Sequence, residues 1–143
     1  MERKEKQKIY STFKQDLEQF ATNVQELIHD AELSTKREFL QKIADDVNRL
    51  YESSIQVQKA QDEDAEEIGA IVQNIFVQPL AVKAHGHISI KKAVETFEPE
   101  KEGETDLSYI MREYVTHPES TKSFVRELEL LSEEFDTILR QIA

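Results

Sequence analysis

The sequence contains no cysteine and no tryptophan, and it has only three glycines and three prolines in 143 residues. A chain without cysteine forms no disulfide and offers neither a thiol nucleophile nor a thiolate metal ligand. The glycines, Gly69, Gly86 and Gly103, lie too far apart to form a glycine-rich phosphate-binding loop. Long apolar runs are also missing, since stretches such as 75–77 are far too short to cross a bilayer. No apolar signal region follows the charged N-terminus, so we expect a cytoplasmic protein.

Basic residues are outnumbered by acidic ones, and nearly all of the difference lies in the second part of the chain. Residues 1–60 carry ten Lys and Arg against eleven Asp and Glu, a net charge of −1. Residues 61–143 carry eight against eighteen, which supplies −10 of the total of −11. Such a surface is repelled by nucleic-acid phosphates and anionic membranes, so we expect neither as a partner. We interpret the acidic runs at 62–67 and 98–106 as solvated surface and helix N-termini, with an acidic mimic of DNA as the alternative.

Glycine and proline are both absent before Gly69, which favours long helices in this part of the chain. Apolar residues spaced by three or four positions form one stripe, close to a coiled-coil seam, and predict a helix over 4–31. The stripe then changes phase, so we expect a second helix over 36–60, folded back as an antiparallel hairpin. Thr35 and Glu38 fit a capping box at the break. The first stripe consists of Ile9, Phe13, Leu17, Phe20, Val24, Leu27 and Ala31.

A third helix is expected to start in the acidic run, with Asp62 or Asp64 as its cap. Pro79 lacks an amide donor and should end or kink this helix. The following ten residues show no strand long enough to matter, and Ser89 is placed to cap a short helix.

The segment 98–105 has no apolar side chain, so we expect an exposed, mobile loop there. Asp106 is the expected cap of the next helix, and Pro118 suits the first position of the last one, over 118–142. A second apolar seam in this last helix consists of Phe124, Leu128, Leu131, Phe135, Ile138 and Ile142.

These patterns predict an all-α fold, a helical bundle of five to six helices built on a long antiparallel hairpin and a long C-terminal helix. We expect a single domain over 1–143. Its predicted parts are the hairpin 4–60, shorter helices within 62–97, the acidic loop 98–105 and C-terminal helices within 106–142.

Catalytic chemistry has no visible support in the sequence, which shows no nucleophile–base pair, nucleophile elbow or Walker loop. We therefore expect no catalytic residue, no cofactor and no enzymatic activity.

Metal binding would depend on the four histidines. His85 and His87 are two positions apart, so their imidazoles could face one ion if the segment were extended. Such a site would need a third ligand, for example His29, His117 or a carboxylate from 62–67. A polar turn is the simpler interpretation, and no metal is favoured. A phosphoacceptor role for one of the pair is a further alternative.

The apolar seams favour a non-catalytic protein–protein interaction module, regulatory or adaptor-like, that binds a protein partner or itself. We expect a homodimer, because the short elements look too few to cover both long stripes. The alternative function is a metal-binding or metal-sensing bundle that uses His85 and His87. The predicted interface residues are Ile9, Phe13, Leu17, Phe20, Val24, Leu27, Phe124, Leu128, Leu131 and Phe135.

Overall fold

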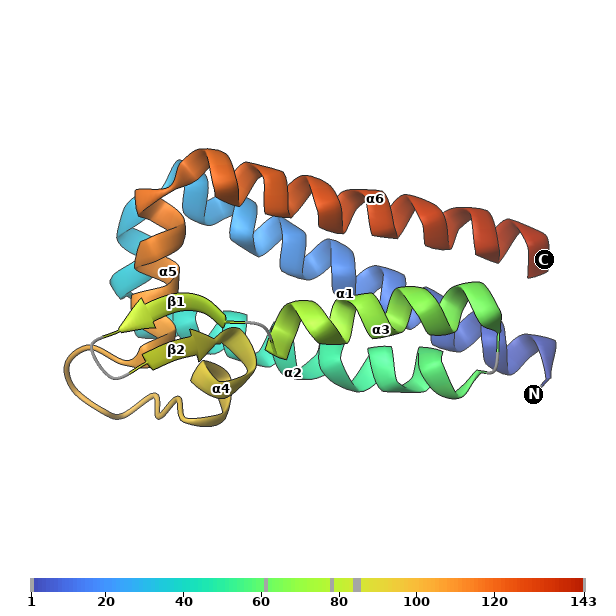
Figure 1. Cartoon of the computed structure of the whole chain (residues 1–143), viewed down its shortest axis with the longest axis horizontal. Coiled ribbons are helices and arrows are strands. Elements are labelled where there is room, and N and C mark those ends of the chain that lie inside the picture. Colours follow the sequence, from blue (N-terminus) through green and yellow to red (C-terminus); the bar gives the residue numbers. More distant parts are fainter. Residues whose placement is uncertain (1, 61, 78, 84–85, 143) are drawn as a thin grey trace.

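Figure 1 shows the computed structural model of the chain, which describes residues 2–60, 62–77, 79–83 and 86–142. For 77, 79–83, 86 and 87 the description covers the backbone alone. Four long helices run side by side, and the shorter elements gather at one end of them. The first long helix begins and the last one ends at the opposite end of the molecule (Figure 1).

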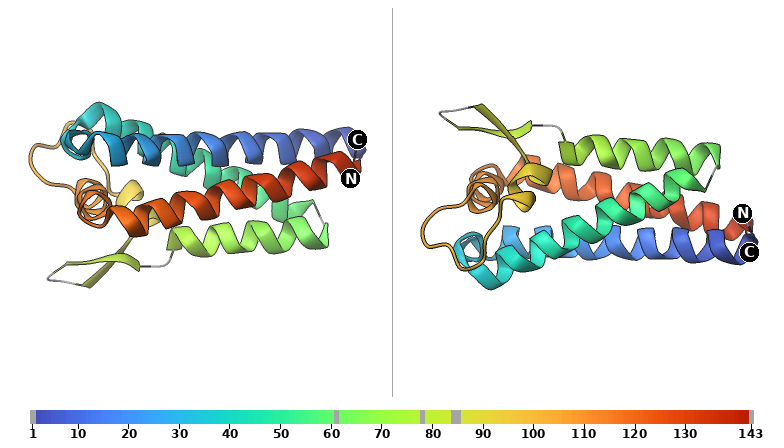
Figure 2. Two further views of the ribbon diagram at one scale, coloured as in Figure 1. Left: turned by 90° about the horizontal axis from the view of Figure 1, so that it is seen from above. Right: turned by 90° about the horizontal axis from the view of Figure 1, so that it is seen from below.

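The long helices are α1 (Arg3–His29), α2 (Arg37–Lys59), α3 (Glu63–Val77) and α6 (Pro118–Ile142). Neighbouring helices run in opposite directions, so the chain follows an up-down-up-down course (Figures 1 and 2). Helix α1 packs along both α2 and α6, and α2 packs along α3. The predicted all-α helical bundle is therefore confirmed.

The break between the first two helices is a short 3-10 helix, η1 (Ala31–Thr35). Asp30 caps it, because its side chain accepts a hydrogen bond from the Glu32 amide at 3.2 Å. The Thr35 hydroxyl donates back to the Glu32 carbonyl at 2.9 Å. The predicted capping box of Thr35 and Glu38 is therefore wrong: Lys36 occupies the N-cap position of α2 and makes no side-chain cap bond.

The segment after α3 forms a two-stranded antiparallel hairpin, β1 (Pro79–Lys83) and β2 (Gly86–Ser89), which the sequence did not predict. Proline cannot continue a helix, and the two short segments satisfy each other's backbone donors and acceptors. Two short helices follow, α4 (Ile90–Glu95) and α5 (Asp106–Thr116).

Helix caps in this part of the chain confirm one prediction and correct another. Ser89 caps α4 as predicted, since its hydroxyl accepts a hydrogen bond from the Lys92 amide at 3.2 Å. The cap of α5 is Thr105, which forms a capping box with Ser108, so the prediction of Asp106 as cap is wrong. Asp106 lies one position further on, in the first turn, where a carboxylate still faces the positive end of the helix dipole.

The seam between α1 and α6 is the most heavily packed part of the core. Phe135 of α6 lies with its ring centre 5.7 Å from that of Tyr10 and 4.7 Å from that of Phe13. Phe20 and Phe124 meet edge to face at 6.1 Å further along the same seam. Burying each such ring is worth about 1.5–3 kcal/mol, so this seam supplies much of the stability.

Helices α2 and α3 approach each other closely at Gly69. A Cβ atom at this position would lie 3.2 Å from both the Ser54 carbonyl oxygen and Gln58 Cγ. The glycine that interrupts the apolar pattern of α3 therefore permits close backbone packing. The fourth side of the bundle is different, because α3 and α6 scarcely touch. Among the described residues, no helix is long and apolar enough to span a membrane.

Candidate functional site: the groove between α3 and α6

Two adjoining hollows lie between α3 and α6, where these helices fail to pack together. Their volumes are about 470 and 390 Å³, and Ile71 and Glu134 line both. We call them together the α3–α6 groove. Its α3 wall consists of Asp64, Glu67, Ile68, Ile71, Asn74 and Ile75. Its α6 wall consists of Glu127, Leu130, Leu131, Glu134, Thr137, Ile138 and Gln141. With a rise of 1.5 Å per residue, the α3 wall is ~17 Å long.

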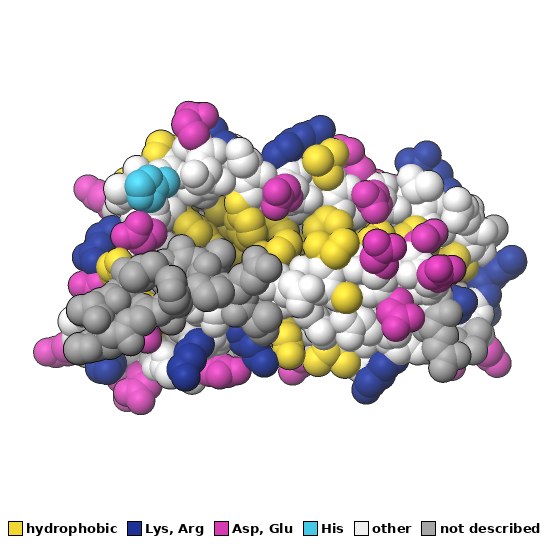
Figure 3. Space-filling model, in the orientation of Figure 1, with side chains coloured by type: hydrophobic (Ala, Val, Ile, Leu, Met, Phe, Trp, Pro, Cys, Tyr) yellow, Lys and Arg dark blue, Asp and Glu magenta, His cyan; other side chains and the backbone are white. Residues whose placement is uncertain are grey.

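The α3–α6 groove exposes apolar surface. Ile71 is 45% exposed and Leu130 is 44% exposed, and these are the two exposed large hydrophobic side chains among the described residues. They face the same groove from opposite walls. Figure 3 shows hydrophobic side chains gathered between α6 and α3, with acidic side chains along the border. A sizeable apolar surface with a polar rim is typical of an interaction site.

The local sequence of α3 explains why it has two apolar faces. Ala65, Val72 and Phe76 are fully buried on the face that packs into the bundle. Ile71 and Ile75 are four positions apart and fall on a neighbouring face, because each helical residue turns by about 100°. A helix whose apolar surface is this wide contacts more than one neighbour. Among the described residues, the inner face packs against its neighbours, whereas the face with Ile71 leaves that side chain exposed.

The predicted interface residues lie mainly inside the single chain. Seven are buried, namely Phe13, Leu17, Phe20, Val24, Leu27, Leu128 and Phe135. The other three, Ile9, Phe124 and Leu131, are partly buried against the core. The two seams therefore face each other within one chain, with α1 against α6. Leu131 is the member that also lines the α3–α6 groove.

The predicted metal ligands cannot be assembled from the described part of the chain. His85 and the side chain of His87 lie outside the described residues. His29 and His117 are both exposed, and His117 Nε2 lies 3.5 Å from Glu113 Oε2. The described residues contain no group of three or more potential ligands placed to hold a metal ion.

A buried polar network joins α1 to α2. Asp46 is 2% exposed and accepts hydrogen bonds from the Asn23 side-chain amide and from Arg49, the latter at 2.5 Å. Burial raises the pKa of the Asp46 carboxyl above its usual range, and the hydrogen bonds from Asn23 and Arg49 oppose that shift. The network fixes the register of the two helices, and its outer member, Arg49, borders the hollow between α1 and α2.

Two buried tyrosine hydroxyls, of Tyr10 and Tyr114, have no hydrogen-bond partner among the described residues. Burial, reinforced by the charge of Asp62, raises the pKa of Tyr10 to about 12. Burial also raises the pKa of Tyr114. Both hydroxyls therefore stay protonated near neutral pH.

A further hollow of about 760 Å³ lies between α1 and α2, on the side of the bundle opposite the α3–α6 groove. It is lined by Ile9 and Ile55, but charged side chains of both signs surround them, including Lys8, Asp16 and Arg49. It therefore has neither the strongly exposed apolar side chains nor the charge of a single sign that characterise the α3–α6 groove.

The sequence predicts a third helix here but indicates no site at Ile71 or Ile75. Leu130 lies outside the predicted seam of the last helix. The available signal was its position beside Leu131, because it adds an apolar residue next to a seam that already runs through Leu128, Leu131 and Phe135.

No protein-family model, no curated protein and no solved structure matches this chain. The functional conclusion therefore depends on the geometry of the site alone.

Proposed function

We propose that the protein is a non-catalytic protein-interaction module that binds an amphipathic helix of another protein in the α3–α6 groove. The bound helix would lie across the seam that α3 and α6 leave open, and its apolar face would cover Ile71 and Leu130. This is the helix-in-groove mode of peptide recognition.

The observation that carries the proposal is the placement of the exposed apolar side chains. Both large hydrophobic residues that are exposed in the described part of the chain face one groove from opposite walls. The groove is ~17 Å long on the α3 side, which matches about three turns of a helix at 5.4 Å per turn. Its width comes from the weak contact between α3 and α6.

The experiment uses a designed, labelled peptide of about four helical turns, with leucines at i, i+3, i+4 and i+7 and with neutral glutamine flanks. Binding to the full chain is measured by fluorescence anisotropy. We expect saturable binding that is lost in the double variant Ile71→Asp/Leu130→Asp. The control variant Ile55→Asp introduces one such carboxylate in the hollow between α1 and α2, and it should leave binding unchanged.

Circular dichroism and urea unfolding of each variant show whether it is folded. The proposal is wrong if the wild-type chain does not bind the peptide, or if the folded double variant binds it as well as the wild type.

Self-association through the long helices stays a prediction. The two apolar seams on which it was based face each other within one chain, so the proposal places the partner at the α3–α6 groove instead. Sedimentation equilibrium at micromolar concentration distinguishes the two, because a monomer has a mass of 16.6 kDa. Metal binding at His85 and His87 also stays a prediction, and metal analysis of untagged protein tests it.

A further inference from the structure

The rim of the α3–α6 groove carries charge of one sign. Asp64 and Glu67 line it from α3, and Glu127 and Glu134 line it from α6. No Lys or Arg is among the described residues that line either hollow. A helix seated between these walls would meet carboxylates along both of its edges.

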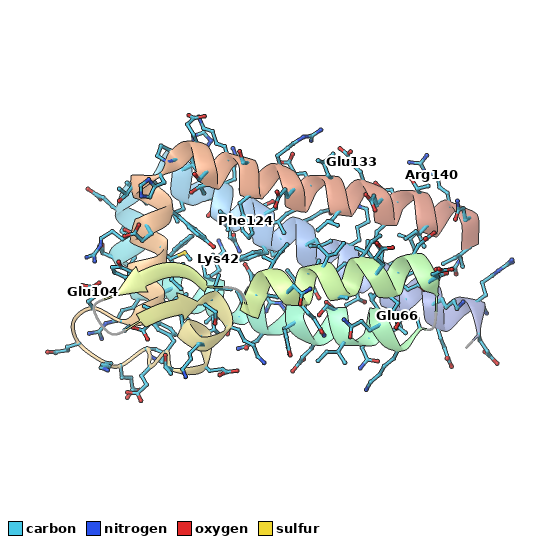
Figure 4. The ribbon with its side chains drawn as sticks, in the orientation of Figure 1. Lys42, Glu66, Glu104, Phe124, Glu133 and Arg140 are labelled. Atoms are coloured by element: carbon cyan, nitrogen blue, oxygen red, sulfur yellow. The ribbon has the colours of Figure 1, made fainter. Side chains whose placement is uncertain are left out.

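The other carboxylates of α6 already have cationic partners. Arg126 lies 3.2 Å from Glu129 and 3.7 Å from Glu133, and Lys14 of α1 lies 3.4 Å from Asp136. Glu129, Glu133 and Asp136 line a hollow that α6 forms with α1 rather than with α3. Glu133 points outward from α6 in Figure 4. Arg140 projects from that same face (Figure 4), so it does not neutralise the groove.

Unlike the other carboxylates of α6, the four rim carboxylates have no ion-pair partner among the described residues. Three of the four, Asp64, Glu67 and Glu134, surround a single hollow at the end of the groove where α3 begins. The fourth, Glu127, lies about two turns from Glu134 along α6, since the two are seven positions apart. The compensating charge is therefore missing on the groove face of α6 and present on its opposite face.

We propose, building on the function above, that the partner of the α3–α6 groove is an amphipathic helix with Lys or Arg along both edges of its apolar stripe. The apolar stripe covers Ile71 and Leu130, and the cationic edges face the carboxylates of both walls. Complementary charge of this kind raises the association rate and selects against acidic partners more than it adds raw affinity.

A second copy of this chain is an unfavourable occupant of the groove, because like charges would face each other. Each chain carries a net charge of −11, and residues 61–143, which form both walls of the groove, carry −10 of it. Pairing two grooves face to face would bring eight rim carboxylates together, twice the four that line one groove, without a cation among the lining residues.

The test compares three designed peptides that share one leucine stripe and differ in their flanks, which carry lysine, glutamine or glutamate. Binding to the full chain is measured by fluorescence anisotropy at low and at physiological ionic strength. We expect the lysine peptide to bind about tenfold more tightly than the glutamine peptide, and the glutamate peptide to bind most weakly. Added salt should weaken the lysine peptide alone.

Two matched double variants localise the effect on α6. Glu127→Gln/Glu134→Gln removes rim charge and should weaken the lysine peptide several-fold while leaving the glutamine peptide unchanged. Glu129→Gln/Glu133→Gln makes the same change on the opposite face and should leave both peptides unchanged.

The outcomes separate this inference from the function on which it rests. If all three peptides bind equally well, the groove binds helices without charge selection and the inference is wrong, although the proposed function stands. If both double variants weaken the lysine peptide equally, the attraction belongs to the whole acidic protein and the inference is again wrong. If no peptide binds, and sedimentation shows a dimer, a second copy covers the groove and both proposals fail.

Discussion

Helix α6 forms two seams, and they differ in every respect that the structure describes. Its seam with α1 is closed by aromatic rings packed at steep angles to one another, by a hydrogen bond of 3.0 Å from Ser132 to Glu18, and by the ion pair of Lys14 with Asp136. Its seam with α3 has no hydrogen bond or ion pair among the described residues and leaves Leu130 exposed. One helix thus uses one face for stability, and the proposed function assigns its other face to a partner.

The comparison shows how to distinguish core from binding surface in an amphipathic helix. Seven apolar residues of the α1–α6 seam are buried within the chain, and the charges around the seam are paired. The α3–α6 groove combines exposed apolar side chains with charge of one sign that has no ion-pair partner among the described residues. On the proposed function, one ligand, a cationic amphipathic helix, would cover the apolar side chains and pair with the charge.

The largest expected effect concerns the closed seam. Replacing Phe135 with alanine leaves a cavity beside Tyr10 and Phe13 and should lower the free energy of unfolding by about 3–5 kcal/mol. The matched change Leu130→Ala, on the open seam of the same helix, should cost less than about 1 kcal/mol. Urea unfolding of the two variants gives both values. Equal losses in the free energy of unfolding would mean that the two seams contribute equally to stability, which would contradict the difference described between them.

The next effect concerns the close approach of α2 and α3. Gly69→Leu places a side chain against the Ser54 backbone and should cost about 1–3 kcal/mol, because a packed backbone cannot give way. Asn74→Leu adds the same side chain on the groove face of α3, where space is available, and should leave stability within about 0.5 kcal/mol. Thermal unfolding followed by circular dichroism checks both changes. A larger loss for Asn74→Leu would show that the groove is not open.

A pH-dependent effect is expected at the buried Asp46. Burial raises the pKa of this carboxyl in the folded protein above its ordinary value, so the folded state binds a proton more readily than the unfolded state. Stability contributed by this group is therefore lost as pH rises from the unfolded pKa through the folded one. Asp46→Asn removes the titration, so its stability relative to wild type should rise between about pH 4 and about pH 7.

Urea unfolding of the wild-type and Asp46→Asn chains at both pH values measures this difference. A relative stability that stays constant, or that falls with increasing pH, would contradict the assigned cause. The pH trend, rather than the absolute difference, is diagnostic because the asparagine also loses the ion pair with Arg49.

The smallest effect is expected in the loop between α4 and α5. Glu102 is exposed there and has no contact that contributes to either seam. Glu102→Ala should change the free energy of unfolding by less than about 0.5 kcal/mol. A Glu-specific protease should nonetheless cleave the folded chain first within 98–104, as mass spectrometry of the fragments would show. Initial cleavage within α1 or α6 would mean that the long seams open more readily than the loop.

Much of the fold follows from the sequence, because the apolar spacing of the long helices is regular and few residues interrupt it. The buried set Phe13, Leu17 and Phe20 matches the predicted stripe of the first helix. The caps were harder to predict, since the neighbour Thr105 can make the hydrogen bond expected of Asp106, and the Thr35 hydroxyl bonds within η1 instead. The β-hairpin went unpredicted because its two strands are short and their pairing has no strong local signal.

The candidate site was harder to predict from the sequence than the fold. The sequence shows that Phe135 and Leu130 are both apolar, but the choice of which one meets α1 depends on the rotation of α6 about its axis. Burial settles this choice, because Phe135 is fully buried and Leu130 is 44% exposed. Likewise, the net charge of the second part of the chain was evident from the sequence. The ion pair of Glu129, and the lack of one for Glu127 among the described residues, required coordinates.

Methyl NMR of the full chain titrated with the lysine-flanked peptide is the most direct test of the central claim, that the open seam binds a cationic amphipathic helix. The methyl signals of Ile71, Ile75 and Leu130 should shift on binding, while those of Ile43 and Leu50, buried on α2, stay in place. Shifts centred instead on Ile9 and Ile55, in the hollow between α1 and α2, would contradict the account, as would the absence of any shift.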